Sequence, residues 1–275
     1  MSLSSTKMGT PTPHVGKGVK EAPRVHSRFL ERPLDLTRDL DGGEFATRAI
    51  RVWDFPVRAV HWTQAALVAV SVATGFTGGN ALRLHRLSGY AILVLVVFRV
   101  LWGFAGGRHA RFSAFLRGPR AVATFVRDTV ALRRPLHVGH NPLAGWMTLA
   151  LLAALFMQAG TGLFANDDIA FEGPLASAVT KDLSDTLTSV HRTHARVLLA
   201  LVALHIGAAL FHLAIERRNL IAAMVTGKRQ WPEGLEAPDP GRPRPWLAAA
   251  LFLAACVAVA LVINGPGLGR TGGGP

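Results

Sequence analysis

Five apolar runs constrain this chain more than any other feature of its sequence. The hydrocarbon core of a bilayer is about 30 Å thick, and a helix of about 20 apolar residues crosses it. Four runs meet that length with almost no charge, and a fifth is shorter and richer in alanine: 60–77, 87–104, 143–164, 193–215 and 246–263. A buried helix of a soluble domain is the alternative for the fifth, but its polar, proline-rich flanks favour a span. The sequence therefore predicts an all-α integral membrane protein, with a four-helix transmembrane bundle and a fifth, C-terminal transmembrane helix.

The charges between the runs predict how the chain lies in the membrane. Lys and Arg collect on the cytoplasmic flanks of membrane spans. The arm before the first run is basic, as are the segments after the second and fourth runs, whereas the segment between the third and fourth is acidic, with Asp167, Asp168, Glu172, Asp182 and Asp185. This pattern predicts a multi-pass protein of the bacterial cytoplasmic (inner) membrane with a cytoplasmic N-terminus. A net charge of +13 could also indicate nucleic-acid binding, but arginines that flank spans are explained by topology. Membrane lipid is therefore an expected partner, and nucleic acid is not.

Composition divides the chain into five parts. Residues 1–50 are rich in Pro, Gly and Ser and lack the apolar core of a signal peptide, so we expect a basic, largely disordered cytoplasmic arm. Residues 51–230 form the four-helix domain, 231–245 a Pro-rich cytoplasmic linker, 246–264 the fifth helix and 265–275 a flexible Gly-rich tail. Residues 110–132, between the second and third spans, mix apolar residues with arginines and are interrupted at Gly118-Pro119. The part after Pro119 is expected to form either an interfacial amphipathic helix or a solvated loop.

Four histidines lie at membrane depth: His61, His85, His191 and His205. Fourteen residues separate the last two, which places them on nearly one helix face about 21 Å apart along the axis. His61 opens the first apolar run and His85 opens the second, and consecutive spans are antiparallel. The arrangement predicts two pairs, His61 with His205 near the inner surface and His85 with His191 near the outer one. Each pair could hold a haem between helices.

Each histidine also has a simpler interpretation. Histidine inside a span is costly and tends to be functional, but His205 could hydrogen-bond to a neighbouring helix and His61 could be an interfacial anchor. His85 could belong to a loop. His194 shares the face of His191, so periodicity does not choose between them, and His212 could line a quinone pocket, relay protons or reach the headgroups.

Two imidazoles saturate a haem iron axially, so such a site suits electron transfer rather than binding of oxygen or substrate. The chain has no CxxCH motif and one cysteine, Cys256, so the haem would be of b type and non-covalently bound. Haem propionates need cationic or hydrogen-bonding partners. Arg58 and Arg99 are candidates at the inner site, and Arg86, Arg192 and Arg196 at the outer one. The alternative for each is snorkelling to the lipid headgroups.

Five stretches of the chain resemble the bacterial cytochrome b561 and nickel–iron hydrogenase cytochrome b-subunit family. They are VWD with RAVHW (52–62), HRLSGY (85–90), FRVLWG (98–103), QAGTGL (158–163) and the run 191–212. The resemblance covers roughly residues 51–229. It implies a four-helix domain with two b haems, whose ligands lie one on the first helix, one on the second and two on the fourth. Because the family spaces the last two by fourteen residues, the resemblance selects His191 over His194.

The function expected first is transfer of electrons between a periplasmic redox partner and the quinone pool, as part of a respiratory chain. The partner would be a c-type cytochrome or an oxidoreductase subunit, and the acidic outer loop could dock it or be acidic through topology alone. An alternative makes the chain a stand-alone enzyme, a quinone-coupled oxidoreductase acting on a small substrate such as superoxide. A histidine-lined metal transporter is less favoured, because the histidines divide between two depths and the spans contain essentially no carboxylates.

Overall fold

The structure, a computed structural model, describes residues 47–131, 139–169, 171–233, 236, 239, 241 and 244–268. The predicted arm (1–50) and tail (265–275) lie mostly outside this part of the chain. Within it, five helices are long and apolar enough to cross a membrane: α2 (Phe55–Thr77), α3 (Leu82–Ala105), α6 (Pro142–Gly162), α7 (Lys181–Ala214) and α9 (Pro245–Leu268). The all-α membrane fold and the fifth helix are confirmed.

The helices begin at polar caps that lie before the apolar runs. The Asp54 side chain accepts a hydrogen bond from the Val57 N–H at the start of α2, and the Asn141 side chain accepts one from the Ala144 N–H at the start of α6. A capping side chain of this kind satisfies an N–H group that has no partner within the helix. Helix α7 is capped by Thr180 and begins twelve residues before the predicted span at 193. Its polar first turns belong to the loop at that end rather than to the apolar run.

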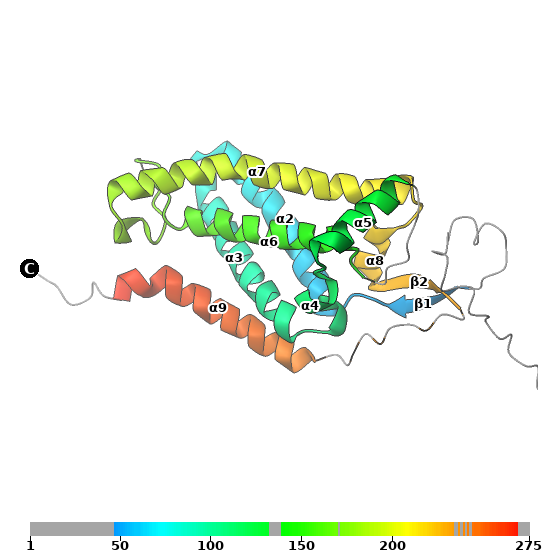
Figure 1. Cartoon of the computed structure of the whole chain (residues 1–275). Coiled ribbons are helices and arrows are strands. Elements are labelled where there is room, and N and C mark those ends of the chain that lie inside the picture. Colours follow the sequence, from blue (N-terminus) through cyan, green and yellow to red (C-terminus); the bar gives the residue numbers. More distant parts are fainter. Residues whose placement is uncertain are drawn as a thin grey trace, which may run out of the picture.

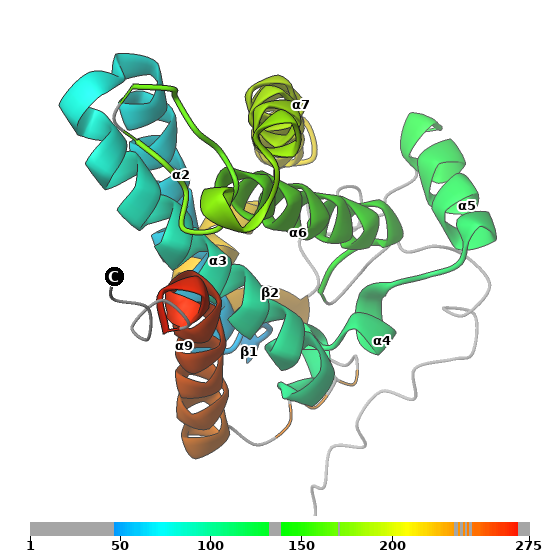
Figure 2. The same ribbon diagram turned by 90° about the vertical axis from the view of Figure 1, so that its left-hand side faces the viewer.

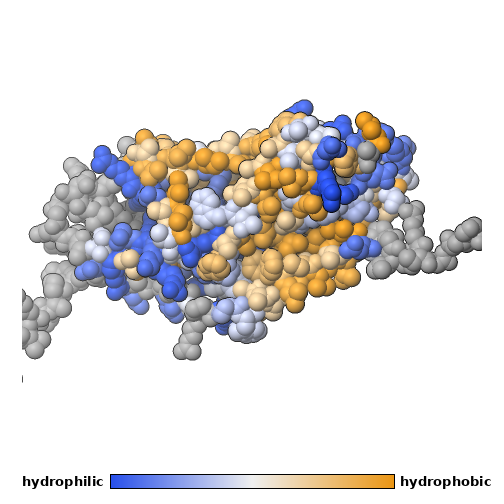
Figure 3. Space-filling view, turned by 180° about the vertical axis from the view of Figure 1, so that it is seen from behind, coloured by the Kyte–Doolittle hydropathy of each residue, from blue (hydrophilic) through white to orange (hydrophobic). Residues whose placement is uncertain are grey.

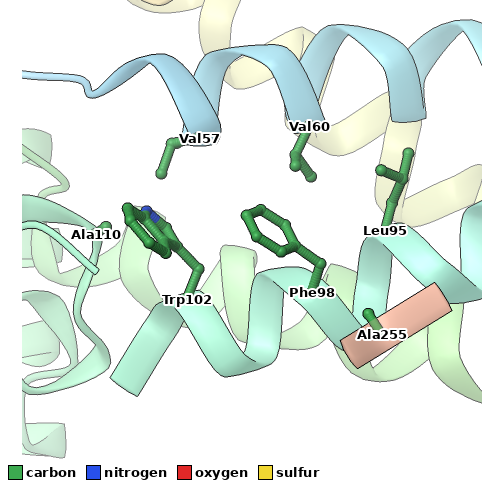
Figure 4. Packing of buried hydrophobic residues seen from close by; sticks show 7 residues of the cluster. All are labelled: Val57, Val60, Leu95, Phe98, Trp102, Ala110 and Ala255. Atoms are coloured by element: carbon green, nitrogen blue, oxygen red, sulfur yellow. The ribbon is translucent and has the colours of Figure 1, made fainter. Parts of the chain in front are cut away.

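Helix α3 is the centre of the packing. It contacts α2, α6 and α9, while α7 packs against α6 (Figures 1 and 2). In the largest buried cluster, Val57 and Val60 of α2 face Phe98 and Trp102 of α3 (Figure 4). Ala255 of α9 is fully buried against the same cluster, which places the fifth helix on the outside of α3. The fifth helix therefore lies beside the four-helix domain and away from α7.

One end of the molecule, the basic end, is closed by a small antiparallel sheet. Strand β1 (Thr47–Arg51) pairs with β2 (Lys228–Pro232), with Ile50 opposite Arg229. The predicted domain boundaries at 50 and 230 therefore both fall inside strands, because pairing between segments this distant is not visible in a local pattern. The short helix α8 (Leu220–Thr226) ends at Gly227, whose φ of 77° favours glycine. The Gly227 carbonyl accepts hydrogen bonds from the Val52 and Trp53 N–H groups and thus fixes the entry to α2.

The segment between α3 and α6 also lies at the basic end. It contains α4 (Phe112–Phe115) and α5 (Pro119–Val130). Of the two alternatives for residues after Pro119, the structure forms the helix. Phe125 is buried on one face of α5, and Arg120 and Arg127 are exposed.

The opposite end, the acidic end, is the segment 163–180 together with the first turns of α7 (Figure 1). Asn166 holds it in place, because its side-chain amide donates to Ser184 and Asp185 and its backbone N–H donates to Thr188. Asp167 accepts hydrogen bonds from the N–H groups of two residues of its own loop. Hydrophobic residues cover much of the surface between the two ends, and hydrophilic ones gather toward the ends (Figure 3). This distribution fits a protein that spans a bilayer.

Candidate functional site

The structure brings the four membrane-depth histidines together in two pairs. The ring centres of His61 (α2) and His205 (α7) lie 6.2 Å apart, with their planes at 58°. Those of His85 (α3) and His191 (α7) lie 6.0 Å apart, with their planes at 88°. These are the pairs that the antiparallel geometry predicts. His85 lies inside α3, which begins at Leu82, and not in a loop.

The spacing within each pair matches two imidazoles on opposite sides of one metal ion. Metal–imidazole bonds are about 2.0 Å long, which puts the two ring centres about 6 Å apart. No group of three or more histidine, cysteine or carboxylate side chains that could hold a metal ion occurs in the described part of the chain. Two ligands are too few for an ordinary protein metal site but sufficient for a metal whose other ligands come with a cofactor. The pairs therefore fit the axial positions of a haem.

Backbone carbonyls orient both rings at the acidic end. His85 Nδ1 lies 2.8 Å from the Ser71 carbonyl oxygen, and His191 Nδ1 lies 2.9 Å from the Gln158 carbonyl oxygen. A carbonyl oxygen only accepts, so Nδ1 carries the hydrogen in both rings and Nε2 keeps its lone pair. This is the usual second hydrogen bond of a metal-binding histidine, which fixes the tautomer and ring orientation.

The contacts of Gln158 also distinguish His191 from His194 as the candidate ligand on α7. The ring opposite His85 belongs to His191, while His194 Nδ1 lies 2.8 Å from the side-chain oxygen of Gln158. Gln158 also donates through its amide nitrogen to the His191 carbonyl, at 3.1 Å. Gln158 of α6 thus contacts both candidate ligands, and only His191 faces the His85 ring of α3.

Two glycines leave room for the acidic-end rings. A Cβ atom on Gly75 of α2 would lie 3.0 Å from His85 Nδ1, and one on Gly162 of α6 would lie 3.0 Å from His191 Cε1. Most real Cβ atoms stay farther away, so a side chain there would displace the ring. Around Gly89, in contrast, the space within 4 Å of a Cβ atom is open among the described residues.

The basic-end pair lacks this hydrogen bonding. His61 Nδ1 is buried and has no hydrogen-bond partner among the described residues. Its ring lies edge-on to the neighbouring Trp62, with ring centres 5.1 Å apart. The two pairs thus share their spacing but differ in the groups that orient the rings.

The predicted arginines Arg58 and Arg99 both lie near the basic-end pair. Arg58 donates through Nη1 to the Val225 carbonyl, which ties α2 to α8, and its Nε is buried without a partner among the described residues. Arg99 is 6% exposed, and its guanidinium lies 5.5 Å from the centre of the Phe112 ring. The arginines expected at the other level, Arg86, Arg192 and Arg196, are all exposed.

The structure adds two histidines to which the sequence assigns no chemistry. The His140 ring centre lies 4.6 Å from those of Trp53 and Phe115, and His140 Nε2 lies 3.2 Å from Thr148 Oγ1. Burial lowers the pKa of His140 to about 3, with Arg99, His205, His109 and His61 adding to the effect. His109 is close by, and burial followed by Arg108 lowers its pKa. A sequence signal exists for His140, since Asn141-Pro142 marks a helix start and places it at the membrane surface.

His212 takes no part in either pair. Its Nδ1 lies 2.9 Å from Glu216 Oε2 near the end of α7, and Arg218 Nη1 is 3.5 Å from the same oxygen. The three side chains form a polar group at the basic end.

Residues 52–227 match the family model of the prokaryotic cytochrome b561. The chain is also similar to proteins described as probable Ni/Fe-hydrogenase B-type cytochrome subunits. It is 26% identical to that of Bradyrhizobium diazoefficiens over 214 residues, which cover 66% of this chain and 86% of the relative. It is 27% identical to that of Rhizobium leguminosarum bv. viciae over 227 residues, covering 70% and 95%, and 26% identical to that of Rhodobacter capsulatus over 234 residues, covering 71% and 87%. No solved structure matches the chain.

Proposed function

Because this chain belongs to the prokaryotic cytochrome b561 family and is a multi-pass membrane cytochrome b of electron transfer, we propose that it holds two b haems and carries electrons across the membrane between them. One haem would lie between His61 and His205, and the other between His85 and His191. The observation that carries the proposal is the presence of two histidine pairs, each with ring centres about 6 Å apart as expected for one metal ion. On α7 the two ligands are fourteen residues apart, or about 21 Å along the helix.

The haem supplies a one-electron redox centre when bound. The two histidines of each pair would hold the haem iron from both sides and leave no position for a substrate. The Ser71 and Gln158 carbonyls accept from Nδ1 of the two acidic-end rings, which leaves Nε2 of each ring as the nitrogen that could bind iron. With the iron held in this way neither pair would make or break a substrate bond, so the proposed role is conduction of electrons.

The charge distribution supports an orientation in the inner membrane. Arginines and lysines of β1, β2 and the α3–α6 segment lie at the basic end, and this end would face the cytoplasm. The acidic end would then face the periplasm. In this orientation the pair His61 and His205 is the inner one, and the N-terminus is cytoplasmic.

We further propose that the chain exchanges electrons with a periplasmic oxidoreductase subunit or c-type cytochrome on one side and with the quinone pool in the membrane. The relatives are described as probable cytochrome subunits of a Ni/Fe hydrogenase. For this chain, support comes from the acidic end, where Glu172 and Asp182 are exposed and form no ion pair with a described residue. Asp167 and Asp168 are less suited to docking, because Asp167 holds its own loop and Asp168 pairs with Lys181 at 2.7 Å.

Reversing the charges of Glu172 and Asp182 should slow electron exchange with a basic c-type cytochrome. We expect the combined Glu172→Lys and Asp182→Lys variant to lose about tenfold or more of the bimolecular rate at low ionic strength, because long-range attraction raises encounter rates. Added salt should remove most of the difference. Stopped-flow mixing at several salt concentrations measures both effects. Arg120→Glu at the opposite end is the matched control, and equal rates for all three proteins at low salt would remove the docking role.

A redox titration of the purified protein tests the proposal itself. Pyridine haemochrome quantification should give two b haems per chain, and the titration should resolve two potentials. Reduced protein in proteoliposomes should then reduce an added ubiquinone analogue. A single haem per chain would contradict the proposal. Quinone reduction driven by superoxide without a protein partner would instead favour the stand-alone oxidoreductase.

A further inference from the structure

Polar side chains without partners gather around the pair His61 and His205. Six buried polar atoms there have no hydrogen-bond partner among the described residues: Arg58 Nε, His61 Nδ1, Gln64 Nε2, Arg99 Nη1, His109 Nε2 and His140 Nδ1. Buried polar atoms are nearly always hydrogen-bonded, because leaving one unpaired costs its full desolvation energy. A cluster of them therefore points to a polar ligand group at this place.

Arg99 lies at the depth of this pair. It follows His85 by fourteen residues on α3, the spacing that separates His191 from His205 on α7. Arg99 and His85 thus share one face of α3 and lie about 21 Å apart along it. His85 faces His191 from this side of α3. Arg99 therefore places its positive charge on the same side of α3, at the depth of His61 and His205.

Arg99 forms no ion pair with a carboxylate of the described residues, and its Nη1 has no hydrogen-bond partner there. Asp54 interacts with Arg99 electrostatically, but both Asp54 oxygens accept hydrogen bonds from other groups. Oδ1 accepts from the Val57 N–H at 2.9 Å and Oδ2 from Trp102 Nε1 at 3.0 Å. Phe112 covers one side of the guanidinium. A buried charge of this kind requires an anion.

His140 presents a second polar atom to the same region. It interacts electrostatically with Arg99, His61 and His205, so it lies close to all three. The Thr148 hydroxyl donates its hydrogen to the Ala144 carbonyl at 2.9 Å, so Thr148 Oγ1 accepts from His140 Nε2 and Nδ1 of the neutral ring keeps its lone pair. Trp53 and Phe115 contact the ring. His140 thus adds a polar acceptor atom from the loop side, while Arg99 offers a donor from α3.

We propose that Arg99, with His140 and His109 beside it, forms the anchor for a propionate carboxylate of the inner haem. This inference rests on the proposed function, since it assumes a haem between His61 and His205. A carboxylate accepts charge-assisted hydrogen bonds from a guanidinium and would give the unpartnered Arg99 Nη1 an acceptor with a negative charge. A quinone is neutral and would bring no negative charge to Arg99. The anchor would fix the haem against rotation and raise its potential, because a nearby cation favours the reduced iron.

The test uses the full-length protein loaded with haem whose propionate carboxyl groups are isotope-labelled. Redox-induced infrared difference spectra identify the propionate bands, and a redox titration gives both potentials. We expect Arg99→Gln to shift the propionate bands and to lower the potential of the inner haem only. His140→Phe, which retains an aromatic ring, should shift the same bands less, because it removes a polar atom beside Arg99 and not the donor itself. Arg99→Lys should restore much of the potential but not the band position, because lysine keeps the charge without the planar guanidinium. Arg120→Gln, an exposed arginine of α5, is the matched control.

Unchanged propionate bands in both Arg99→Gln and His140→Phe, with two haems bound, would overturn the anchor. Loss of quinone-analogue binding with unchanged bands would overturn it too and would assign the cluster to a quinone. If the wild-type protein itself lacks the inner haem, the proposed function fails instead, which the haem count shows before any variant is made. Should Arg99→Gln lose the inner haem, Arg99→Lys and His140→Phe still report the bands.

Discussion

Replacing His61 or His205 with alanine should remove one of the two haems and leave the other in place. Each ring supplies one of the two axial bonds at the basic-end site, and the partner ring 6.2 Å away cannot replace it. His85→Ala and His191→Ala should remove the haem at the acidic end in the same way. Pyridine haemochrome quantification should therefore fall by about half in all four variants, and redox titration should show which potential is lost.

His212→Ala and His194→Ala are the matched controls on α7. His212 pairs with Glu216 and His194 with the Gln158 side chain, so neither faces a second histidine. Both variants should keep two haems, although His194→Ala should alter the outer potential through Gln158. Loss of a haem in His194→Ala but not in His191→Ala would contradict the assignment on this helix.

Gly162→Val should weaken haem binding at the acidic end without touching a ligand. The new side chain would displace the His191 ring, because a Cβ atom added at Gly162 would lie only 3.0 Å from His191 Cε1. The displaced ring would lose its hydrogen bond to the Gln158 carbonyl. Loss of such an orienting contact lowers metal affinity by about 10- to 100-fold, so outer haem should be depleted during purification.

Gly160→Val is the control for this substitution. It lies on the same helix two residues away, and the space around its Cβ is open among the described residues. The haem content of Gly160→Val should equal that of the wild type. If Gly162→Val also retained full haem content and an unshifted outer potential, the packing of Gly162 against His191 would not matter for haem binding.

Much of the fold could be predicted from the sequence because membrane spans are specified locally. A run such as 143–164 has only to be long and apolar to cross the hydrocarbon core, and α6 occupies nearly that range. The opposite charges of the two ends follow from the same local counting. The positions of His191 and His205 on one helix face could also be predicted, because helical periodicity fixes the distance and direction between them.

Other features depend on which faces meet. Helix packing determines which ring lies opposite His85 and how Gly75 and Gly162 contact the histidines. The packing of the loop against α3 determines how His140 approaches the basic-end pair. Strands β1 and β2 are separated by most of the chain, and no alternation in five residues predicts their pairing.

The sequence by itself determined the number of spans, the charge of each end and the two depths at which histidines lie. These properties belong to single helices and to their flanks, and a helix in lipid forms largely on its own because its backbone must satisfy its own hydrogen bonds. Only the tertiary structure decided which rings face one another, which carbonyls orient them and which buried arginine has a nitrogen without a hydrogen-bond partner. Those depend on contacts between side chains far apart in the chain, and packing alone sets them.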